Sequence, residues 1–275
     1  MGRLFDNTVS DYLVSDTIPI QGGVGSTTPH TFCAWINTGK ADIEQVICGF
    51  YDKLTSNQWS TMLFNSNGTF RAHRRVGGGS ATADTVATVT ANTWHHTCAV
   101  MAAPAETRAY LDNRSEGQST TNIADGNNLT HIGIGQHRDT SPSRAFSGAI
   151  AELSIHNIAL SFFERDQLAR WRYSALLVRP EHLVWYRSFR FADLNFDPPD
   201  LLPPQLRQVK HLLFNEDNSY PAFGAHPPGI VYPDVIDAAI LSAGVSVGIT
   251  DGELAAAATS FDNRPFKPDT IFVPS

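Results

Sequence analysis

The chain has 275 residues, of which 42% are hydrophobic and 17% are charged, and its formal net charge is −7 at pH 7. A chain of this length and composition can bury a large core, as one β-domain with an appendage or as two domains. The negative charge argues against nucleic acid as a partner, because phosphate binding needs a positive surface. No apolar run is long enough to cross a membrane, so a membrane partner is not expected.

The first part of the chain predicts a series of strands. Residues 3–14 are expected to form a strand or hairpin, with Asp6 and Asn7 as turn residues. Further strands are predicted over residues 31–36, 44–51 and 59–64. Asn67-Gly68 is a strong hairpin signal, so residues 69–76 are expected to pair with the strand before them. Residues 77–92 begin with a glycine run and are expected to cross the top of the β-structure.

Residues 69–76 place three basic side chains on one face of a strand. Arg71, His73 and Arg75 alternate with Ala72, Arg74 and Val76, and alternate residues of a strand point to the same face. Such a basic cluster is suited to binding a carboxylate or an acidic neighbour. The alternative interpretation is a solvated strand of an acidic protein.

Two later segments carry residues that bind metals in other proteins. His95 and His96 are adjacent, so a regular strand points them to opposite faces and they cannot chelate one metal together. The turns of the following hairpins contain oxygen ligands of the kind that calcium prefers. Asp and Asn also serve turns through local hydrogen bonds, so these residues are candidate calcium ligands and nothing else predicts a cofactor. The candidates are Asp112, Asp125, Asn127 and Asn128.

Residues 146–171 predict a strand, a tight reversal and a short helix. Ala151, Leu153 and Ile155 alternate with polar residues, which is typical of a strand with one buried face. Ser161 and Glu164 have the spacing of a capping box, which marks the start of a helix. Leu168 and Trp171 are expected to share one face of that helix.

Composition changes after the helix. Twelve of the 16 prolines follow Arg179, so residues 176–275 are expected to form a long, Pro-rich, extended arm. Recurring apolar residues predict that this arm docks on its own sandwich or on neighbouring subunits. The aromatic anchors predicted for it are Trp185, Tyr186, Phe214, Phe223, Tyr232, Phe261, Phe266 and Phe272.

Cysteine usage and the N-terminus bear on the cellular compartment. The three cysteines lack a Cys-x-x-Cys spacing, which is typical of reduced core thiols. Residues 1–13 have no apolar segment like that of a signal peptide. Both features favour assembly in a cytoplasm.

Five segments occur in an order that resembles laminin G-like, concanavalin A-like jelly rolls. They are TFCAWI (31–36), NTWHHTCAV (92–100), RAYLD (108–112), IGIG (132–135) and FSGAIAELSIHNIALSFFE (146–164). The resemblance implies an all-β jelly-roll sandwich over the first 175 residues. Proteins of this fold often bind carbohydrate, which makes Tyr51, Trp59 and His73 candidates for stacking on a sugar.

A narrower resemblance is to laminin G-like proteins of tailed bacteriophages, carried by MGRLFD-x-x-x-S-x-Y-L at the start and SALLVRPEHLVWY at residues 174–186. It implies a structural virion protein assembled in the host bacterial cytoplasm, most simply a capsid decoration or minor capsid protein held by its arm. Its expected partners are other virion proteins and further copies of itself. The alternatives are a tail or tail-fibre component, or a module that binds host surface glycans.

A glycoside hydrolase on the same fold is not expected. Such an enzyme needs two carboxylates about 5 to 10 Å apart, and no Glu-x-Asp-x-x-Glu strand motif occurs. We therefore expect a protein that binds or assembles and does not catalyse a reaction.

Overall fold

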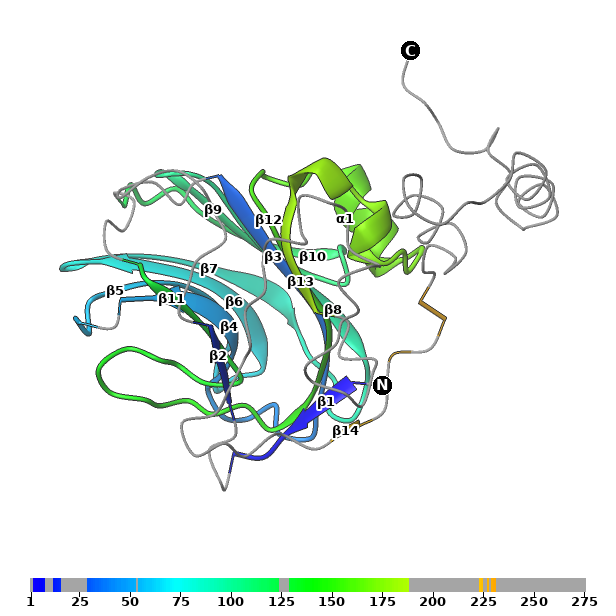
Figure 1. The fold of residues 1–275 in the computed structure, drawn as a ribbon, viewed down its shortest axis with the longest axis horizontal. Helices are drawn as coiled ribbons and strands as arrows, with labels where there is room; N and C mark the ends of the chain where they lie inside the picture. The colour runs from blue at the N-terminus through cyan, green and yellow to red at the C-terminus, as the bar shows by residue number, and fades with distance from the viewer. Residues whose placement is uncertain are drawn as a thin grey trace, which may run out of the picture.

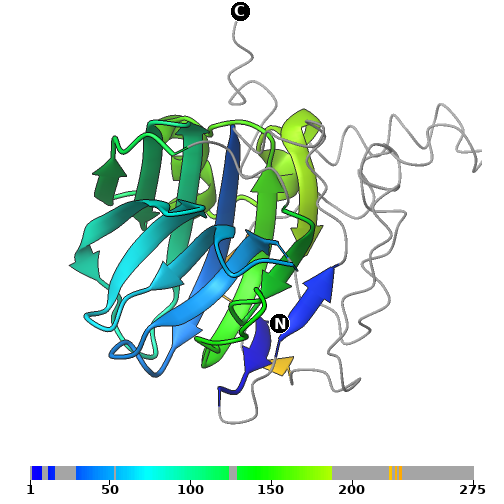
Figure 2. The ribbon, with the colours of Figure 1, turned by 90° about the vertical axis from the view of Figure 1, so that its left-hand side faces the viewer.

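The computed structural model describes residues 2–7, 12–15, 29–52, 54–123, 129–187, 223–224, 227 and 229–230. Within these residues the chain forms two antiparallel sheets packed face to face, with one short helix outside the sandwich (Figures 1 and 2). This confirms the predicted all-β sandwich with a short helix. Among the described residues, no helix is long and apolar enough to span a membrane.

The first sheet has eight strands within the described part of the chain, in the order β10-β9-β8-β3-β12-β1-β14, with β13 also paired to β12. These strands are β1 (Gly2–Phe5), β3 (His30–Thr38), β8 (His95–Ala103), β9 (Glu106–Leu111), β10 (Ser115–Ser119), β12 (Gly148–His156), β13 (Leu183–Arg187) and β14 (Phe223–Gly224).

The second sheet has six strands among the described residues, in the order β2-β11-β4-β5-β6-β7. These strands are β2 (Leu13–Ser15), β4 (Gln45–Tyr51), β5 (Gln58–Phe64), β6 (Thr69–Val76), β7 (Gly79–Thr88) and β11 (His131–Ile134). The β5–β6 hairpin confirms the turn predicted at Asn67-Gly68, where Gly68 has a φ of 80°.

The main core lies between the two sheets. Phe32 of β3 and Phe50 of β4 meet across it with ring centroids 4.7 Å apart. His30 is buried beside both rings, and its Nε2 lies 2.9 Å from Ser60 Oγ. A buried histidine with a hydroxyl partner has its polar atom satisfied, so His30 is part of the packing.

Residues 3–14 form neither the one strand nor the hairpin that the sequence predicted. β1 pairs with β12 in the eight-stranded sheet, whereas β2 pairs with β11 in the six-stranded sheet. Phe5 and Leu13 nevertheless both enter the main core, because they approach it from opposite sheets. The pairing of β1 with β12 brings the first strand beside a late strand of the sandwich.

The prediction that residues 77–92 cross the top of the sandwich is also wrong. Most of this segment forms β7, which pairs with β6 after a tight turn in which Gly77 has a φ of 59°. Small side chains at Ala81 and Ala83 face the core and alternate with exposed polar residues. β7 also approaches β10 of the other sheet, since the Ala87 amide donates to Ser115 Oγ at 2.8 Å.

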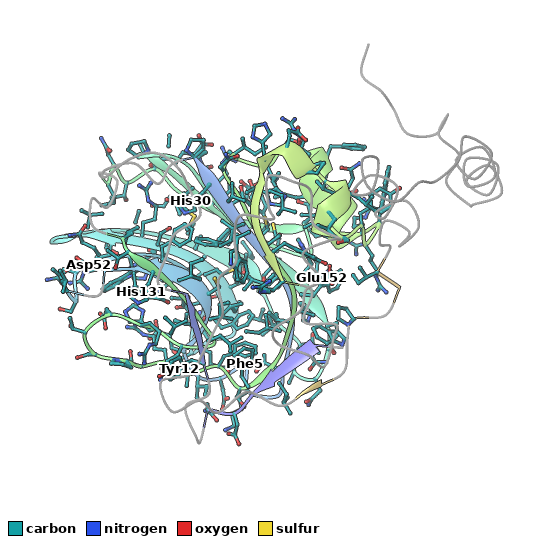
Figure 3. All side chains as sticks on the ribbon, viewed as in Figure 1. Phe5, Tyr12, His30, Asp52, His131 and Glu152 are labelled. Atoms are coloured by element: carbon teal, nitrogen blue, oxygen red, sulfur yellow. The ribbon has the colours of Figure 1, made fainter. Side chains whose placement is uncertain are left out.

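A bulge in β12 allows this strand to have two partners on one side. β12 pairs with β1 over its first residues and with β13 over its last. Its register against β3 shifts between Ala151 and Ser154, and within that bulge Glu152 has a φ of 52° (Figure 3). Its buried carboxylate accepts a 2.6 Å hydrogen bond from the Tyr186 hydroxyl, so β13 satisfies the bulged residue.

The helix α1 (Phe162–Ala169) covers the outer face of the eight-stranded sheet (Figure 1). Both hydrogen bonds of the predicted capping box between Ser161 and Glu164 are present. Leu168 is buried in a second apolar cluster with Cys33, Cys98 and Tyr186. The expectation that Leu168 and Trp171 share one face of the helix is wrong, because the helix ends at Ala169, before Trp171, which is 47% exposed.

The folded unit continues beyond residue 175, the predicted end of the sandwich. The short 3₁₀ helices η1 (Ala175–Leu177) and η2 (Pro180–His182) lead into β13. Trp185 enters the main core and Tyr186 enters the cluster beneath α1. These two predicted anchors therefore dock on the protein's own sandwich.

The remaining anchors are only partly within the described residues. Phe223 lies in β14, and its backbone pairs with Arg3 of β1. Phe214, Tyr232, Phe261, Phe266 and Phe272 lie outside the described residues.

The three cysteines are free and buried, as their sequence context predicted. Cys33 and Cys98 face each other across β3 and β8, with their sulfur atoms 2.7 Å apart. Burial raises the pKa of the Cys33 and Cys48 thiols above their ordinary values. The thiolate is the reactive form of cysteine, so neither residue is poised for nucleophilic chemistry.

Candidate functional site

The candidate glycan-binding residues come together on the outer face of the six-stranded sheet, opposite the core. Tyr51, Trp59 and His73 lie on the neighbouring strands β4, β5 and β6. Tyr51 is directly opposite Trp59, and the Trp59 and His73 rings have centroids 5.5 Å apart. We call these three residues, together with Arg71, Arg75 and His137, the outer aromatic–basic cluster.

The loop between β11 and β12 folds over part of this cluster. Its residue His137 makes edge-on contacts with both Tyr51 and Trp59, with ring centroids 4.8 Å apart in each case. Tyr51 is fully buried and Trp59 is 6% exposed. In this conformation neither ring has a free face for a sugar, and stacking on them requires the loop to move.

The loop is held in place by several interactions. His137 and Ser143 form a β-bridge, and Asp139 Oδ2 lies 3.1 Å from His137 Nε2. His131 lies on the same side of the sandwich (Figure 3) and donates a 2.6 Å hydrogen bond to the Arg138 carbonyl oxygen. Burial lowers the pKa of His137 despite the opposing effect of Asp139, so the imidazole is neutral at pH 7.

The side chains of Arg71, His73 and Arg75 share the outer face of β6, as the alternation predicted. The Trp59 indole donates to His73 Nδ1 at 3.4 Å, and His73 Nε2 therefore carries the proton and donates to Ser80 Oγ at 2.9 Å. Burial and the neighbouring charge of Arg71 lower the pKa of His73 to about 4. His73 is thus a neutral, oriented ring between cationic groups.

Most of the charges around the cluster are paired within the protein. Arg71 makes a two-bond ion pair with Asp84, at 2.6 and 2.8 Å. Arg144 pairs with Glu44 at 2.9 Å. In contrast, Arg75 makes no ion pair within the described residues and lies 5.0 Å from the centroid of the Trp59 ring.

Three polar atoms in the cluster are buried without a hydrogen-bond partner among the described residues. They are the Tyr51 hydroxyl, His137 Nδ1 and Arg75 Nε. An unpartnered buried polar atom costs about 1 to 3 kcal/mol. Native proteins usually satisfy such groups with protein, water or ligand, so their concentration on one face singles it out as a candidate binding site.

Of the candidate calcium ligands, only Asp112 lies within the described residues. Its carboxylate accepts hydrogen bonds from His95 Nδ1 at 2.7 Å and from the His96 amide at 2.8 Å. Burial raises the pKa of Asp112, but these hydrogen bonds outweigh it and leave the pKa below its ordinary value. Asp112 therefore fixes its own turn and the start of β8.

The other three calcium candidates, Asp125, Asn127 and Asn128, lie outside the described residues. In the part of the chain that the structure describes, no group of three or more His, Cys, Asp or Glu side chains is arranged to hold a metal ion.

The buried histidines predict a loss of stability in mild acid. Burial lowers the pKa values of His96 and His156 to about 4, whereas an exposed histidine titrates near 6.5. Protonation therefore favours the unfolded chain, and stability is expected to fall as the pH decreases from about 6.5 to 4, by about 2 to 3 kcal/mol for each histidine.

Urea unfolding at pH 7 and pH 4.5 measures this effect. His156→Gln retains a donor for the Val178 carbonyl oxygen, which His156 Nε2 contacts at 3.1 Å, but it cannot titrate. We expect the variant to lose about 2 to 3 kcal/mol less than the wild type between the two pH values. Equal losses would contradict the role of His156.

The sequence patterns did not reveal the contribution of the loop over the cluster. His137, Asp139 and Arg144 follow β11 in a stretch with no strand or helix period, so no pattern connects them to β5 and β6. The signal present is compositional, since HRDTSPSR at residues 137–144 combines ring, acidic and basic side chains. The contacts of this segment with Tyr51 and Trp59 are set by the tertiary structure.

Comparisons with solved structures find the same fold at low sequence identity. A candidate carbohydrate-binding protein from Bacteroides ovatus ATCC 8483 is 17% identical over 70% of this chain and 52% of that chain, with a TM-score of 0.50. The K499G mutant of the NanB sialidase from Streptococcus pneumoniae is 14% identical over 60% of this chain and 27% of that chain, with a TM-score of 0.50. Domains LG4-5 of the mouse laminin α1 chain are 17% identical over 56% of this chain and 40% of that chain, with a TM-score of 0.41.

At these identities the likeness to the two structures with a TM-score of 0.50 shows the fold alone, and the chain spans about half or less of the length of each of the three proteins. A comparison with curated proteins found no match. The family model for the concanavalin A-like lectin/glucanases superfamily matches residues 9–163, which is more than half of the chain. The chain therefore belongs to the concanavalin A-like lectin/glucanases superfamily and contains a laminin G-like jelly-roll domain.

Proposed function

We propose that this protein binds carbohydrate through the outer aromatic–basic cluster of the six-stranded sheet. The observation that carries this proposal is the group of buried polar atoms without partners beside Trp59 and His73. Sugars are bound by aromatic faces together with a few oriented polar groups, a combination common to small-molecule sites. The cluster carries both kinds of group on one sheet face, and its aromatic faces open to a ligand when the loop that holds His137 moves.

The comparisons support the same class of function. The superfamily is named for lectins and glucanases, and the Bacteroides ovatus protein that shares the fold is a candidate carbohydrate-binding protein. Because a fold hosts many functions, the argument for this chain rests on its own cluster.

The proposed activity is glycan binding without hydrolysis of the glycan. Hydrolysis of a glycosidic bond uses one carboxylic acid and one carboxylate that flank the bond. The acids around the cluster are instead bound by neighbouring side chains, since Asp84 and Glu44 form ion pairs with Arg71 and Arg144 and Asp139 contacts the neutral imidazole of His137. These contacts support a role for the acids in orienting their neighbours.

A glycan array probed with the full chain tests the proposal. Thr82 is exposed on β7 opposite His73, so Thr82→Trp places a bulky ring over the cluster without entering the core. We expect wild type to bind a defined set of glycans and this variant to lose at least about tenfold in affinity for them.

Gln118→Trp is the matched control, because Gln118 is exposed on β10 of the other sheet. It is expected to bind as the wild type does. Binding that survives Thr82→Trp would exclude this face, and the absence of any bound glycan would overturn the proposed function.

A second candidate is the structural virion role implied by the sequence resemblance, with other virion proteins as partners and assembly in the host cytoplasm. The observation that favours it is an exposed aromatic patch formed by the first turn of α1 and by Trp171. Phe162 and Phe163 are 62% and 52% exposed, and Phe163 contacts Trp171 edge-on with ring centroids 5.5 Å apart. Exposed apolar patches often mark interaction surfaces. Mass spectrometry of purified particles that finds this chain at fixed stoichiometry would support this candidate, and its absence would exclude it.

A further inference from the structure

Arg75 differs from the other cations of the outer aromatic–basic cluster. Arg71 and Arg144 are each bound to a carboxylate of the protein, so their charges are locally balanced. Arg75 has only the ring of Trp59 beneath its guanidinium, 5.0 Å away at the centroid, and its Nε is buried without a partner among the described residues. Of these three arginines, Arg75 is therefore the one without a carboxylate partner among the described residues, in a chain whose net charge is −7.

The side chain of Arg75 is only partly exposed, and its buried Nε becomes available to a ligand when the groups that cover it move. Arg75 is half-buried and lies directly opposite Trp59 on one side and Ser80 on the other. Ser80 is exposed, and its hydroxyl contacts His73 Nε2. A ligand at this position would meet a guanidinium, a hydroxyl and an imidazole within one small area of the sheet.

Resting on the proposed function, we propose that the glycan bound here is anionic, and that Arg75 binds its carboxylate or sulfate group. A guanidinium presents N–H donors in a planar fork that matches the oxygen atoms of such groups. Binding would satisfy the buried Nε and balance the charge of Arg75. A neutral sugar offers no comparable partner to a guanidinium.

The position of Trp59 strengthens this assignment. An arginine above an aromatic ring is partly desolvated and held in orientation by the ring. Less ordering is then required when the ligand arrives, which favours affinity. The carboxylates of Asp84 and Glu44 do not compete with a ligand for Arg75, because they are bound to Arg71 and Arg144.

Calorimetric titration of the full chain with lactose, 3′-sialyllactose and 3′-sulfolactose tests the inference. These three probes share the lactose disaccharide. Lactose itself is neutral, 3′-sialyllactose adds a carboxylate and 3′-sulfolactose adds a sulfate. We expect an anionic probe to bind at least about tenfold more tightly than lactose, with affinity that decreases as salt is added. The stronger of the two anionic probes identifies the group that Arg75 binds.

Arg75→Gln is expected to weaken binding of the anionic probe by about 10- to 100-fold, as loss of a hydrogen bond to a charged group predicts, and to weaken binding of lactose by a smaller factor. Arg75→Lys keeps the charge but loses the fork, so an intermediate affinity is expected. Arg114→Gln is the matched control, because Arg114 is exposed in the β9–β10 turn of the other sheet. It should bind as the wild type does, and thermal unfolding verifies that each variant is folded.

The outcomes separate this inference from the proposed function. Equal affinity for lactose and the anionic probes, abolished by Thr82→Trp and unaffected by Arg75→Gln, would overturn the role of Arg75 and leave carbohydrate binding in place. A failure to bind any glycan in the array would overturn both. Anionic binding that Arg114→Gln weakens as much as Arg75→Gln would show a general charge effect and would also overturn the assignment.

Discussion

Replacement of Trp185 by Ala is expected to lower the free energy of unfolding by about 3 to 5 kcal/mol, the usual cost of removing a large buried aromatic side chain. Trp185 is 2% exposed and belongs to the main core, although it lies beyond the predicted end of the sandwich. Its strand β13 also supplies the Tyr186 hydroxyl that satisfies Glu152. Loss of the Trp185 side chain therefore weakens the packing of the main core and the position of β13, the strand that supports the bulge in β12.

Urea unfolding of the purified chain measures the effect of Trp185→Ala. Trp171→Ala is the matched control, because Trp171 is 47% exposed and lies outside α1. We expect the control to cost less than about 1 kcal/mol. Equal effects of the two substitutions would contradict the inclusion of residues 183–187 in the folded unit.

Gly117→Ala is expected to destabilise the protein by about 3 kcal/mol or more. A Cβ atom at Gly117 would lie 2.0 Å from the backbone oxygen of Asp84 and 2.3 Å from its carbonyl carbon. This backbone cannot move away as a flexible side chain would, so β7 and β10 must separate. Overpacking of this kind costs about 1 to 3 kcal/mol, and more where the contact is with rigid backbone.

Gly78→Ala is the control for this substitution. Gly78 lies in the β6–β7 turn, and an added Cβ atom would meet nothing within 4 Å. Its effect is expected to be within about 1 kcal/mol and to favour the folded state, because alanine restricts the unfolded chain. If thermal unfolding shows that Gly117→Ala is as stable as Gly78→Ala, the close approach of β7 and β10 is incorrect.

Local patterns in the sequence predicted the features that depend on neighbouring residues. Asn67-Gly68 predicted a hairpin because both residues suit its turn, and the Ser161 to Glu164 spacing predicted the helix start. Alternation along β6 placed Arg71, His73 and Arg75 on one face. Each of these features is determined within about ten residues of chain.

Features that depend on distant parts of the chain were not predictable in this way. Nothing in the local pattern of residues 3–14 shows that β1 and β2 join different sheets, since each strand finds its partner more than a hundred residues away. Arg74 faces the core side, where charged residues are rare. Its guanidinium donates to the carbonyl oxygen atoms of Ala103 and Ile123, at 3.0 and 3.4 Å, and the strand pattern does not reveal these distant acceptors.

The candidate site also combines features that depend on neighbouring residues with features that depend on distant parts of the chain. The three glycan candidates lie near one another in the structure, because the adjacent strands β4, β5 and β6 carry Tyr51, Trp59 and His73. The burial of Tyr51 and Trp59 was not predictable from the sequence. The loop that covers them comes from residues 136–144, and its His137 packs on both rings. Access to the aromatic rings is therefore a property of the tertiary structure.

The most direct test of the account is NMR titration of the full chain with 3′-sialyllactose and lactose, following the Trp59 indole N–H and the Arg75 Nε–H signals. Both groups lie at the centre of the proposed site, and the Arg75 Nε is without a partner in the described structure. We predict that an anionic glycan shifts both signals and leaves the exposed Trp171 indole signal unchanged. Binding that shifts Trp171 but not Trp59 and Arg75 would contradict a site on the six-stranded sheet.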